Sequence, residues 1–245
     1  MKNFDDSTYG DSFADVYDDW YATVSDIGAT VGTLRHLGGE GRYLELGVGT
    51  GRLALALAES GVQVTGIDAS RAMLDRLADK RDVSGRNLDA VHGDMVEDQP
   101  PGPFDVVFIA YNTIFGLRTH RRQQALFDTV ATRLAPGGSF VVEAAVPDPQ
   151  RPAGGTVGVR SLSADRVVLS VDVHDPAERT VDGQFIEFTE SGGVRLRPWS
   201  IHYCSPTELD AMARAAGLEL RYRWSDMHRS PFDETSSDHV SVYGF

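Results

Sequence analysis

The stretch YLELGVGTG, residues 43–51, decides the fold of this 245-residue chain. Its first half alternates like a short strand, its second half is glycine-rich, and an Ala/Leu-rich helical segment follows at 52–59. A glycine loop between a strand and a helix is the setting that a nucleotide-binding loop requires, because glycine lets the backbone turn tightly and approach a ligand. The predicted ligand-binding glycines are Gly47, Gly49 and Gly51.

The loop differs from the two common phosphate-binding loops. Its spacing is G-x-G-x-G rather than the G-x-G-x-x-G of dinucleotide binders, and it lacks the Lys-Ser/Thr pair of a P-loop. Glu45 stands just ahead of the glycines. A carboxylate at this point would repel a pyrophosphate, but it suits a ligand with a cationic amine.

Two further carboxylates follow predicted strands. Asp68 ends a strand at 62–67, and Asp94 follows a strand at 88–92. In open α/β sheets ligands bind beyond the carboxyl ends of the strands. Glu45, Asp68 and Asp94 together therefore predict a pocket for an adenosine that bears a positive side chain. Taken singly, Asp68 could instead introduce a helix, and Asp94 could be an acid of a surface loop.

The rest of the chain alternates strand and helix as far as residue 144. Predicted helices at 70–79 and 119–134 alternate with strands at 104–110 and 139–144, which indicates a parallel, doubly wound α/β sheet. After Pro147 the residues from 156 to 202 alternate like antiparallel strands, with Gly192-Gly193 as a hairpin turn. The last predicted elements are a helix at 206–216, capped by Ser205 and stopped by Gly217, and strands at 218–224 and 239–243.

These patterns predict three parts of the chain. Residues 1–40 are helical and aromatic and form an N-terminal lid, in which Tyr9 and Tyr17 could close over the ligands or simply anchor a helix on the core. Residues 41–148 and 203–245 form the ligand-binding domain. Residues 149–202 form an inserted antiparallel cap that binds the substrate.

Five motifs within residues 42–144 resemble those of class I methyltransferases that use S-adenosylmethionine (SAM). The motifs are ELGVGTG at 45–51, GIDAS at 66–70, HGDM at 92–95, FDVV at 104–107 and LAPGG at 134–138. The resemblance implies a Rossmann-like, seven-stranded methyltransferase sheet, with SAM as the cofactor and S-adenosylhomocysteine as its product. It implies no metal, and the seven histidines show no metal-ligand spacing.

The resemblance also implies roles for single residues. The glycine loop packs on the methionine portion of SAM, Asp68 holds both ribose hydroxyls, and Asp94 reaches the adenine amine. Tyr111 lies near the sulfonium. The expected cofactor-binding residues are Tyr9, Tyr17, Glu45, Gly47, Gly49, Gly51, Asp68, Ala69, Asp94, Met95 and Tyr111.

Within this class, the chain is similar to small-molecule and peptide N-methyltransferases of actinobacterial natural-product pathways. Two such groups are the linaridin α-amine methyltransferases and the amino-sugar N,N-dimethyltransferases. The segment YNTIF at 111–115 resembles the first group more closely, and Gly116 stands where the sugar enzymes carry a catalytic histidine. An amine of a small molecule, amino sugar or peptide is the expected acceptor. The alternatives are an O-methyltransferase and a SAM-binding protein without catalysis.

The candidate catalytic residues are His202 and Tyr111. A neutral amine needs only a place to lose its proton, whereas a hydroxyl needs a base. His202 and Tyr203 end the predicted cap, where they could face the substrate. In the alternative, His202 caps a strand end and Tyr203 packs in the core.

Three arginines crowd the start of the predicted helix at 119–134. Positive charge there opposes the helix dipole by roughly 0.3–1 kcal/mol per group. The cluster could mark a site for an anionic substrate, or it could form a solvated face. The residues are Arg118, Arg121 and Arg122.

Composition limits the choice of partners and location. The chain carries 23 basic and 36 acidic residues, a net charge of −13, which repels nucleic acid. No apolar run is long enough to span a bilayer, and Cys204, the only cysteine, allows no internal disulfide. We therefore expect a cytoplasmic enzyme with no nucleic-acid or membrane partner, and a homodimer is possible.

Overall fold

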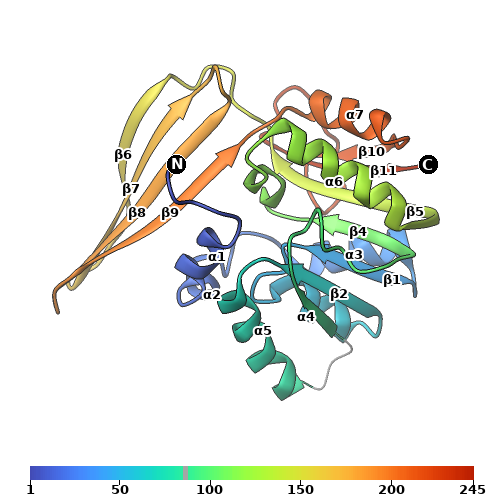
Figure 1. The fold of residues 1–245 in the computed structure, drawn as a ribbon, viewed down its shortest axis with the longest axis horizontal. Helices are drawn as coiled ribbons and strands as arrows, with labels where there is room; N and C mark the ends of the chain where they lie inside the picture. The colour runs from blue at the N-terminus through green and yellow to red at the C-terminus, as the bar shows by residue number, and fades with distance from the viewer. Residues whose placement is uncertain (85–87) are drawn as a thin grey trace.

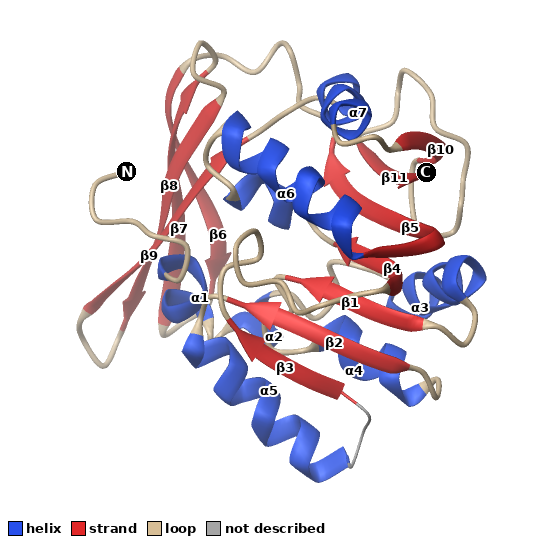
Figure 2. Cartoon of the chain, turned by 45° about the vertical axis from the view of Figure 1, so that its right-hand side comes forward, coloured by secondary structure: helices blue, strands red, loops and turns tan. Residues whose placement is uncertain are grey.

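The computed structural model describes residues 1–84 and 88–245. Within that part of the chain, a seven-stranded sheet has the strand order β10-β11-β5-β4-β1-β2-β3, and a four-stranded sheet has the order β6-β7-β8-β9. Figures 1 and 2 show the two sheets beside one another, with short N-terminal helices between them. The predicted fold class is confirmed, including the inserted antiparallel layer.

The strand order of the larger sheet reverses at β1. β1 (Arg42–Leu46) pairs in parallel with β2 (Gln63–Asp68) on one side and with β4 (Phe104–Ile109) on the other. Ligands of doubly wound sheets bind at this switch point, beyond the carboxyl ends of the strands. The remaining strands are β3 (Leu88–His92), β5 (Leu134–Ala145), β10 (Glu219–Trp224) and β11 (Asp238–Gly244), of which β10 and β11 run antiparallel to their neighbours.

One strand begins earlier than its sequence predicts. β5 starts at Leu134 rather than at residue 139, because Leu134 pairs with Phe104 before the register shifts. The next β4 partner, Val106, pairs with Ser139, so the residues between form an irregularity in the strand. Gly137 has a φ of +82° there, a backbone conformation that glycine adopts without strain.

Helices cover both faces of the larger sheet. One face is covered by α3, α4 and α5, which contribute Leu34, Leu53 and Leu77 to the core. The other face is covered by α6 and α7, which contribute Phe127 and Met212. None of the helices among the described residues is long and apolar enough to cross a membrane. The helices have the bounds α3 (Ile27–Gly38), α4 (Arg52–Glu59), α5 (Arg71–Ser84), η1 (Thr113–Gly116), α6 (His120–Arg133) and α7 (Pro206–Ala215).

Two of these helices begin with side-chain caps, and the sequence predicts the cap at Ser205. The Ser70 hydroxyl accepts a hydrogen bond from the Met73 amide at the start of α5. Ser205 and Glu208 form a reciprocal capping box at the start of α7. The capping box fixes where the chain returns from the antiparallel sheet to the larger sheet.

The antiparallel sheet is a meander with two different faces. Its strands are β6 (Gly154–Leu162), β7 (Arg166–Asp175), β8 (Thr180–Thr189) and β9 (Val194–His202). Gly192 and Gly193, both with φ of +94°, form the predicted turn between β8 and β9. Successive side chains of a strand point to opposite faces. His174, Phe185 and Trp199 therefore lie on the inner face, which is turned toward the N-terminal helices.

The N-terminal helices α1 (Thr8–Phe13) and α2 (Tyr17–Trp20) are fixed on this inner face. The Phe13 ring is fully buried, and its centroid lies 5.9 Å from that of Phe185. Arg197, almost completely buried on β9, forms ion pairs with Asp15 at 2.7 Å and with Glu187 at 3.0 Å. The N-terminal segment thus joins the antiparallel sheet to the ligand-binding end of the larger sheet.

Candidate active site

A cavity of about 570 Å³ lies where the two sheets and the N-terminal segment meet. One wall comes from the loops after β1, β2, β3 and β4, and the opposite wall comes from the inner face of the antiparallel sheet. Most of the predicted site residues line it. They are Tyr9, Tyr17, Gly47, Gly49, Asp68, Ala69, Asp94, Met95 and Tyr111.

Three predicted residues lie outside the cavity lining. Glu45 is buried beneath the glycine loop, Gly51 is the N-cap residue before α4, and His202 ends β9. The His202 carbonyl accepts a hydrogen bond from Gln123, and burial lowers the pKa of its imidazole. His202 does not line the cavity, and its catalytic role stays a prediction.

The glycine loop has the geometry of a ligand cradle. Gly47, Gly49 and Gly51 have φ values of +73°, +55° and +83°, which side-chain-bearing residues rarely adopt. A Cβ on Gly47 would lie 2.5 Å from Thr113, and a Cβ on Gly51 would lie 2.2 Å from Leu77. A Cβ on Gly49 would meet no protein atom within 4 Å. Gly49 therefore borders open space in the cavity, as a loop that packs on a ligand requires.

Asp68 is held rigidly at the end of β2. Its Oδ2 accepts a hydrogen bond from the Gly49 amide, and its Oδ1 accepts one from the Ser70 amide, both at 2.8 Å. Burial raises the pKa of the carboxyl, and these two amides counteract that effect. A carboxylate oriented in this way at the cavity wall can accept two more hydrogen bonds, so it fits the paired ribose hydroxyls of SAM.

Glu45 is a buried acid on β1. Its side chain is 5% exposed, and its Oε2 lacks a hydrogen-bond partner among the described residues. Burial raises the pKa of Glu45 to about 8, although Arg52 opposes the shift. A buried carboxyl with an unsatisfied oxygen is costly in a folded protein. Its position fits a cationic ligand group that approaches through the glycine loop.

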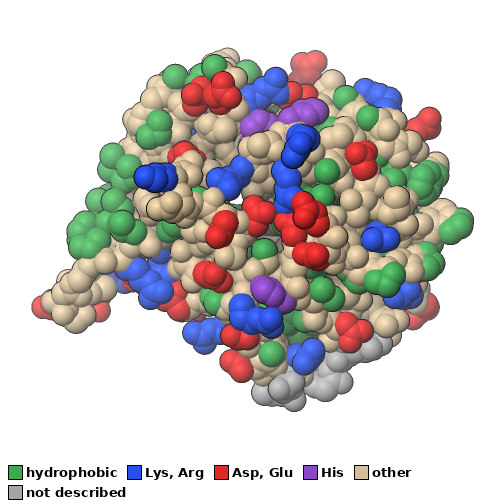
Figure 3. Space-filling view, viewed as in Figure 1, with side chains coloured by type: hydrophobic (Ala, Val, Ile, Leu, Met, Phe, Trp, Pro, Cys, Tyr) green, Lys and Arg blue, Asp and Glu red, His purple; other side chains and the backbone are tan. Residues whose placement is uncertain are grey.

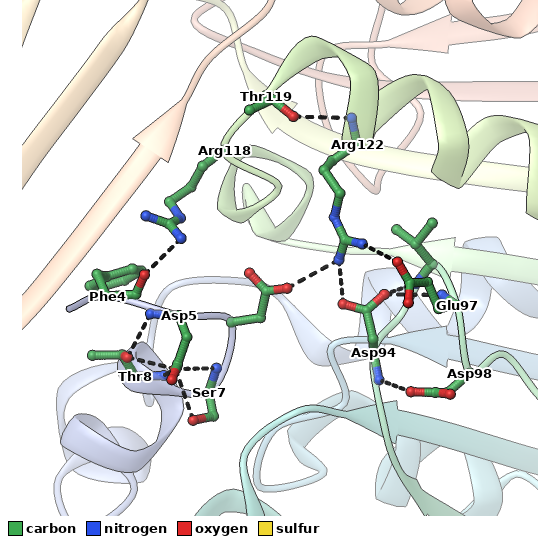
Figure 4. Close-up of polar contacts among 12 residues, drawn as sticks. Phe4, Asp5, Ser7, Thr8, Asp94, Glu97, Asp98, Arg118, Thr119 and Arg122 are labelled. Carbon is green, nitrogen blue, oxygen red and sulfur yellow. Dashed lines mark hydrogen bonds and ion pairs between the residues drawn. The ribbon is translucent and has the colours of Figure 1, made fainter. Parts of the chain in front are cut away.

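Asp94 belongs to a charged cluster around Arg122, which α6 contributes (Figure 4). Its Oδ1 accepts hydrogen bonds from the Val96 and Glu97 amides at 2.8 and 3.0 Å, and its Oδ2 pairs with Arg122. Burial alone would raise the pKa of Asp94, but these partners hold it below its ordinary value. Arg122 also reaches Glu97 at 3.1 Å and Asp6 of the N-terminal segment at 3.0 Å.

Two of the three arginines that could mark an anion site at the start of α6 have partners within the chain. Arg122 already contacts three carboxylates, and Arg118 donates to the Phe4 carbonyl at 2.7 Å and stacks over the Phe4 ring (Figure 4). Neither arginine lines the cavity. Both instead hold the first residues of the chain against the larger sheet.

Tyrosines form the roof of the cavity. The Tyr9 and Tyr21 hydroxyls lie 3.1 Å apart, and the Tyr17 and Tyr21 ring centroids lie 4.8 Å apart. Tyr21 also meets the Tyr111 ring edge-on at 5.9 Å. Tyr111 has a φ of +49°, and its amide donates to Glu143 at 3.1 Å. The aromatic lid and the loop after β4 are therefore in direct contact above the cofactor loops.

The cavity wall carries a polar pair, His174 and Tyr203, of which the sequence named only Tyr203 as a residue that could face the substrate. His174 is buried, and its Nδ1 lies 2.9 Å from the Pro152 carbonyl, which can only accept a hydrogen bond. Nδ1 therefore carries the proton, and Nε2 accepts from the Tyr203 hydroxyl at 2.8 Å when the ring is neutral. Both residues line the cavity. The period-two alternation of β7 could have placed His174 inward, but it could not have identified Tyr203 as its partner.

Other cap residues line this end of the cavity with both apolar and charged side chains. Phe185 and Trp199 supply apolar walls. Arg160 of β6 lies over the Trp20 and Phe185 rings, with its guanidinium carbon 4.7 Å from each centroid. Arg151, which also lines the cavity, pairs with Asp172 at 2.6 Å. An acceptor with both apolar and polar groups fits this wall.

Three comparisons relate the chain to known proteins. Residues 44–138 match the family model described as "Methyltransferase domain". The cypemycin N-terminal methyltransferase of Streptomyces sp is 32% identical over an alignment of 223 residues, and the match covers 88% of this chain and 89% of that protein. The CcbJ methyltransferase from Streptomyces caelestis is 39% identical and has a TM-score of 0.90 over 98% of both chains.

A more distant solved structure has the same fold. The SAM-bound CalS10, an amino pentose methyltransferase from Micromonospora echinaspora, has a TM-score of 0.70 and 22% identity, covering 93% of this chain and 95% of its own. Its bound cofactor agrees with the expectation that such a fold holds SAM.

Proposed function

The chain belongs to the class I SAM-dependent methyltransferases, and from this membership we propose that it methylates an amine nitrogen of a small molecule, amino sugar or peptide in natural-product biosynthesis. The observation that carries the proposal is the continuous cavity, which reaches from Gly49 and Asp68 to His174 and Tyr203. A cofactor and an acceptor can therefore meet in one enclosed space.

The amine is supported by the relatives and by what the site lacks. The cypemycin N-terminal methyltransferase is 32% identical to this chain over 223 residues. Gly116, at the end of η1, lines the cavity where the resembling sugar enzymes carry a histidine. A peptide or small-molecule amine is thus a better candidate than a nucleotide-linked sugar.

The residues of the cavity fit SAM and divide the work of holding it. When bound, SAM supplies a methyl group that its sulfonium already activates. Gly47 and Gly49 would cradle the methionine portion, Asp68 would accept from the ribose hydroxyls, and Asp94 and Met95 would contact the adenine. The tyrosine roof would exclude water and hold the acceptor in line, which are the main tasks that such a transfer leaves to the protein.

The His174–Tyr203 pair provides a path for the proton that the amine loses. The Tyr203 oxygen accepts the amine proton while its own hydroxyl proton passes to Nε2 of His174, and the Pro152 carbonyl stabilises the resulting imidazolium through Nδ1–H. Bound SAM would supply the methyl group to the acceptor nitrogen, and its sulfur would keep the electron pair of the bond that breaks. Asp148 and Arg151 line the same cavity as His174, and Asp172, which pairs with Arg151, lies on the same face of β7.

Mass spectrometry tests the acceptor directly. The protein is incubated with SAM and a panel of amines, amino sugars, short peptides and phenols, and the methylated products are identified. We expect methyl groups on nitrogen. Products methylated only on oxygen would replace the amine with the second candidate, a hydroxyl acceptor, which the presence of His174 as a base in the cavity favours.

The pH dependence of the best acceptor in that panel tests the proton path. His174→Gln and Tyr203→Phe should lower the rate about 10²-fold near neutral pH, and the deficit should shrink near pH 10, where solvent deprotonates an alkylamine. The control is His228→Gln, because His228 is exposed and lies outside the cavity. A deficit that is equal at every pH would assign the pair a structural role only.

We further propose a cytoplasmic location and no nucleic-acid partner. The net charge of −13 disfavours association with a polyanion. Cys204, the only cysteine, is buried and free, which suits a reducing compartment.

A further inference from the structure

Arg160 occupies a break in the pairing of β6 with β7. Val159 pairs with Leu169 and Ser161 pairs with Val168, so Arg160 between them has no partner on β7. Such a β-bulge inserts one extra residue into a strand and redirects its side chain, and bulges are frequent beside active sites. Arg160 lines the cavity. The bulge thus lies where the edge of the antiparallel sheet borders the cavity.

Three aromatic rings surround the Arg160 guanidinium. Its central carbon lies 4.7 Å from the ring centroids of Trp20 and Phe185 and 5.4 Å from that of Tyr21. Figure 3 shows basic side chains gathered where the antiparallel sheet meets the N-terminal helices. A guanidinium over aromatic faces is attracted mainly through its charge. The rings therefore position the side chain and leave its N–H groups for other partners.

Most hydrogen-bond donors of Arg160 lack a partner in the described part of the chain. An arginine has five N–H donors, and Arg160 donates one hydrogen bond, at 3.5 Å, to the Trp20 carbonyl. It forms no ion pair within residues 1–84 and 88–245. The other arginine of the cavity lining, Arg151, pairs with Asp172 at 2.6 Å. Arg160 therefore offers the cavity a positive charge that no carboxylate of the described residues neutralises, although the chain carries 36 acidic and 23 basic residues.

A carboxylate of a ligand matches what this arginine offers. The fork of a guanidinium can donate two parallel hydrogen bonds to the two oxygens of one carboxylate, which fixes orientation as well as position. A few charged groups placed in a largely apolar cavity commonly orient the ligand in this way.

Arg160 also lies near the expected point of methyl transfer. Tyr111 is the residue expected beside the sulfonium, and its ring meets the Tyr21 ring, 5.4 Å from Arg160, edge-on at 5.9 Å. Burial raises the pKa of Tyr111, and the positive charge of Arg160 opposes that rise. A ligand group held by Arg160 would therefore lie close to the reacting atoms.

We propose that Arg160 binds a carboxylate of the acceptor, which makes the acceptor an amine that also carries a carboxylate, such as an amino acid or a short peptide. This inference rests on the proposed N-methylation and narrows its substrate class. The methionine portion of SAM also carries a carboxylate, but the glycine loop that would cradle it lies on the wall opposite β6. Phe185, which contacts Arg160, belongs to the acceptor wall.

Equilibrium binding tests the carboxylate independently of catalysis. Calorimetry on the protein saturated with S-adenosylhomocysteine compares the common amino acids and their dipeptides, each beside its C-terminal carboxamide. The acids that bind should do so about 10- to 100-fold more tightly than their carboxamides, because a charged pair replaces a neutral contact. Arg160→Met should remove this preference, and Arg160→Lys, which keeps the charge without the fork, should reduce it. The control Arg214→Met, at an exposed residue of α7 outside the cavity, should keep it.

The methylation rate of the acid that binds best gives a second readout. In Arg160→Met the loss should appear mainly as a higher KM, because Arg160 holds the acceptor and takes no part in the transfer. Circular dichroism should show that this variant is folded. If it is not, the comparison rests on Arg160→Lys.

The outcomes separate the carboxylate contact from the proposed reaction. Equal binding of acids and carboxamides by the wild type, or binding of no acid, would overturn the inference. So would a loss of S-adenosylhomocysteine affinity in Arg160→Met, which would assign the arginine to the carboxylate of the cofactor. Methyl groups found on oxygen of an acid that binds through Arg160 would instead refute the proposed amine and leave the carboxylate contact intact.

Discussion

Replacement of Glu45 by Gln should stabilise the free protein and weaken its hold on the cofactor. The pKa of Glu45 rises from its ordinary 4.5 to about 8 because burial disfavours the charged carboxylate. Between these two values the unfolded chain has lost the proton and the folded chain keeps it. The unfolded state therefore binds fewer protons, and the free energy of unfolding falls as the pH rises through this interval.

The magnitude follows from the width of the interval. At about 1.4 kcal/mol per pKa unit, the interval from 4.5 to pH 7 lowers the free energy of unfolding by about 3 kcal/mol. Glu45→Gln removes this contribution because Gln does not ionise. Urea unfolding of the free protein at pH 5, 6, 7 and 8 measures it. The wild type should lose stability relative to Glu45→Gln as the pH rises, and the exposed Glu219→Gln should behave like the wild type.

Cofactor binding should ionise the Glu45 carboxyl, which is mostly protonated in the free protein at pH 7. An ammonium close to Glu45 favours the carboxylate, so S-adenosylhomocysteine should bind at pH 7 with release of nearly one proton. Calorimetry in phosphate and in Tris buffer counts that proton, because the two buffers differ in ionisation heat. Glu45→Gln should bind more weakly and release none. Equal pH slopes and equal proton counts in both proteins would show that Glu45 neither titrates between pH 5 and 8 nor meets the cofactor.

Three further predictions concern the cofactor site and the mechanism. Asp68→Ala should weaken S-adenosylhomocysteine binding by about 1–3 kcal/mol in calorimetry, because the ribose hydroxyls lose a charged acceptor, whereas exposed Asp75→Ala should bind normally. Gly49→Val should abolish cofactor binding and leave a folded protein, since its side chain would enter the open space of the cavity. The control Gly61→Val, also at positive φ in open space but outside the cavity, should bind the cofactor normally. Equal binding by both variants would refute the role of the glycine loop as a ligand cradle. Treatment with EDTA should leave the methylation rate unchanged, and a loss that magnesium restores would contradict a metal-free transfer.

The sequence predicted most strands, helices and turns because a few neighbouring residues specify each of them. The apolar run of β4, the Ser205 cap and the positive-φ glycines are each specified by a few neighbouring residues. Strand ends of a doubly wound sheet meet at one edge, so the topology brought Asp68 and Asp94 to the same cavity.

The acceptor end of the site could not be predicted in this way. His174 and Tyr203 come together because β7 and the end of β9 lie on the same wall of the cavity, a tertiary arrangement that periodicity does not encode. Both His202 and Tyr203 were candidates to face the substrate because they end the predicted cap, yet only Tyr203 lines the cavity. The two residues are neighbours at the end of β9, and which of them lines the cavity depends on a strand register that the sequence does not specify.

The ion pairs of Arg122 give the N-terminal segment a dependence on ionic strength. Exposed and half-exposed pairs such as those to Asp6 and Glu97 are each worth at most about 1 kcal/mol, and dissolved ions weaken them further. The aromatic packing of Phe13 against Phe185 has no such dependence. Raising the salt concentration should therefore free the first six residues while the helices behind them stay in place. The exchange of spent cofactor for fresh cofactor would then accelerate with salt, although the methyl transfer itself would not.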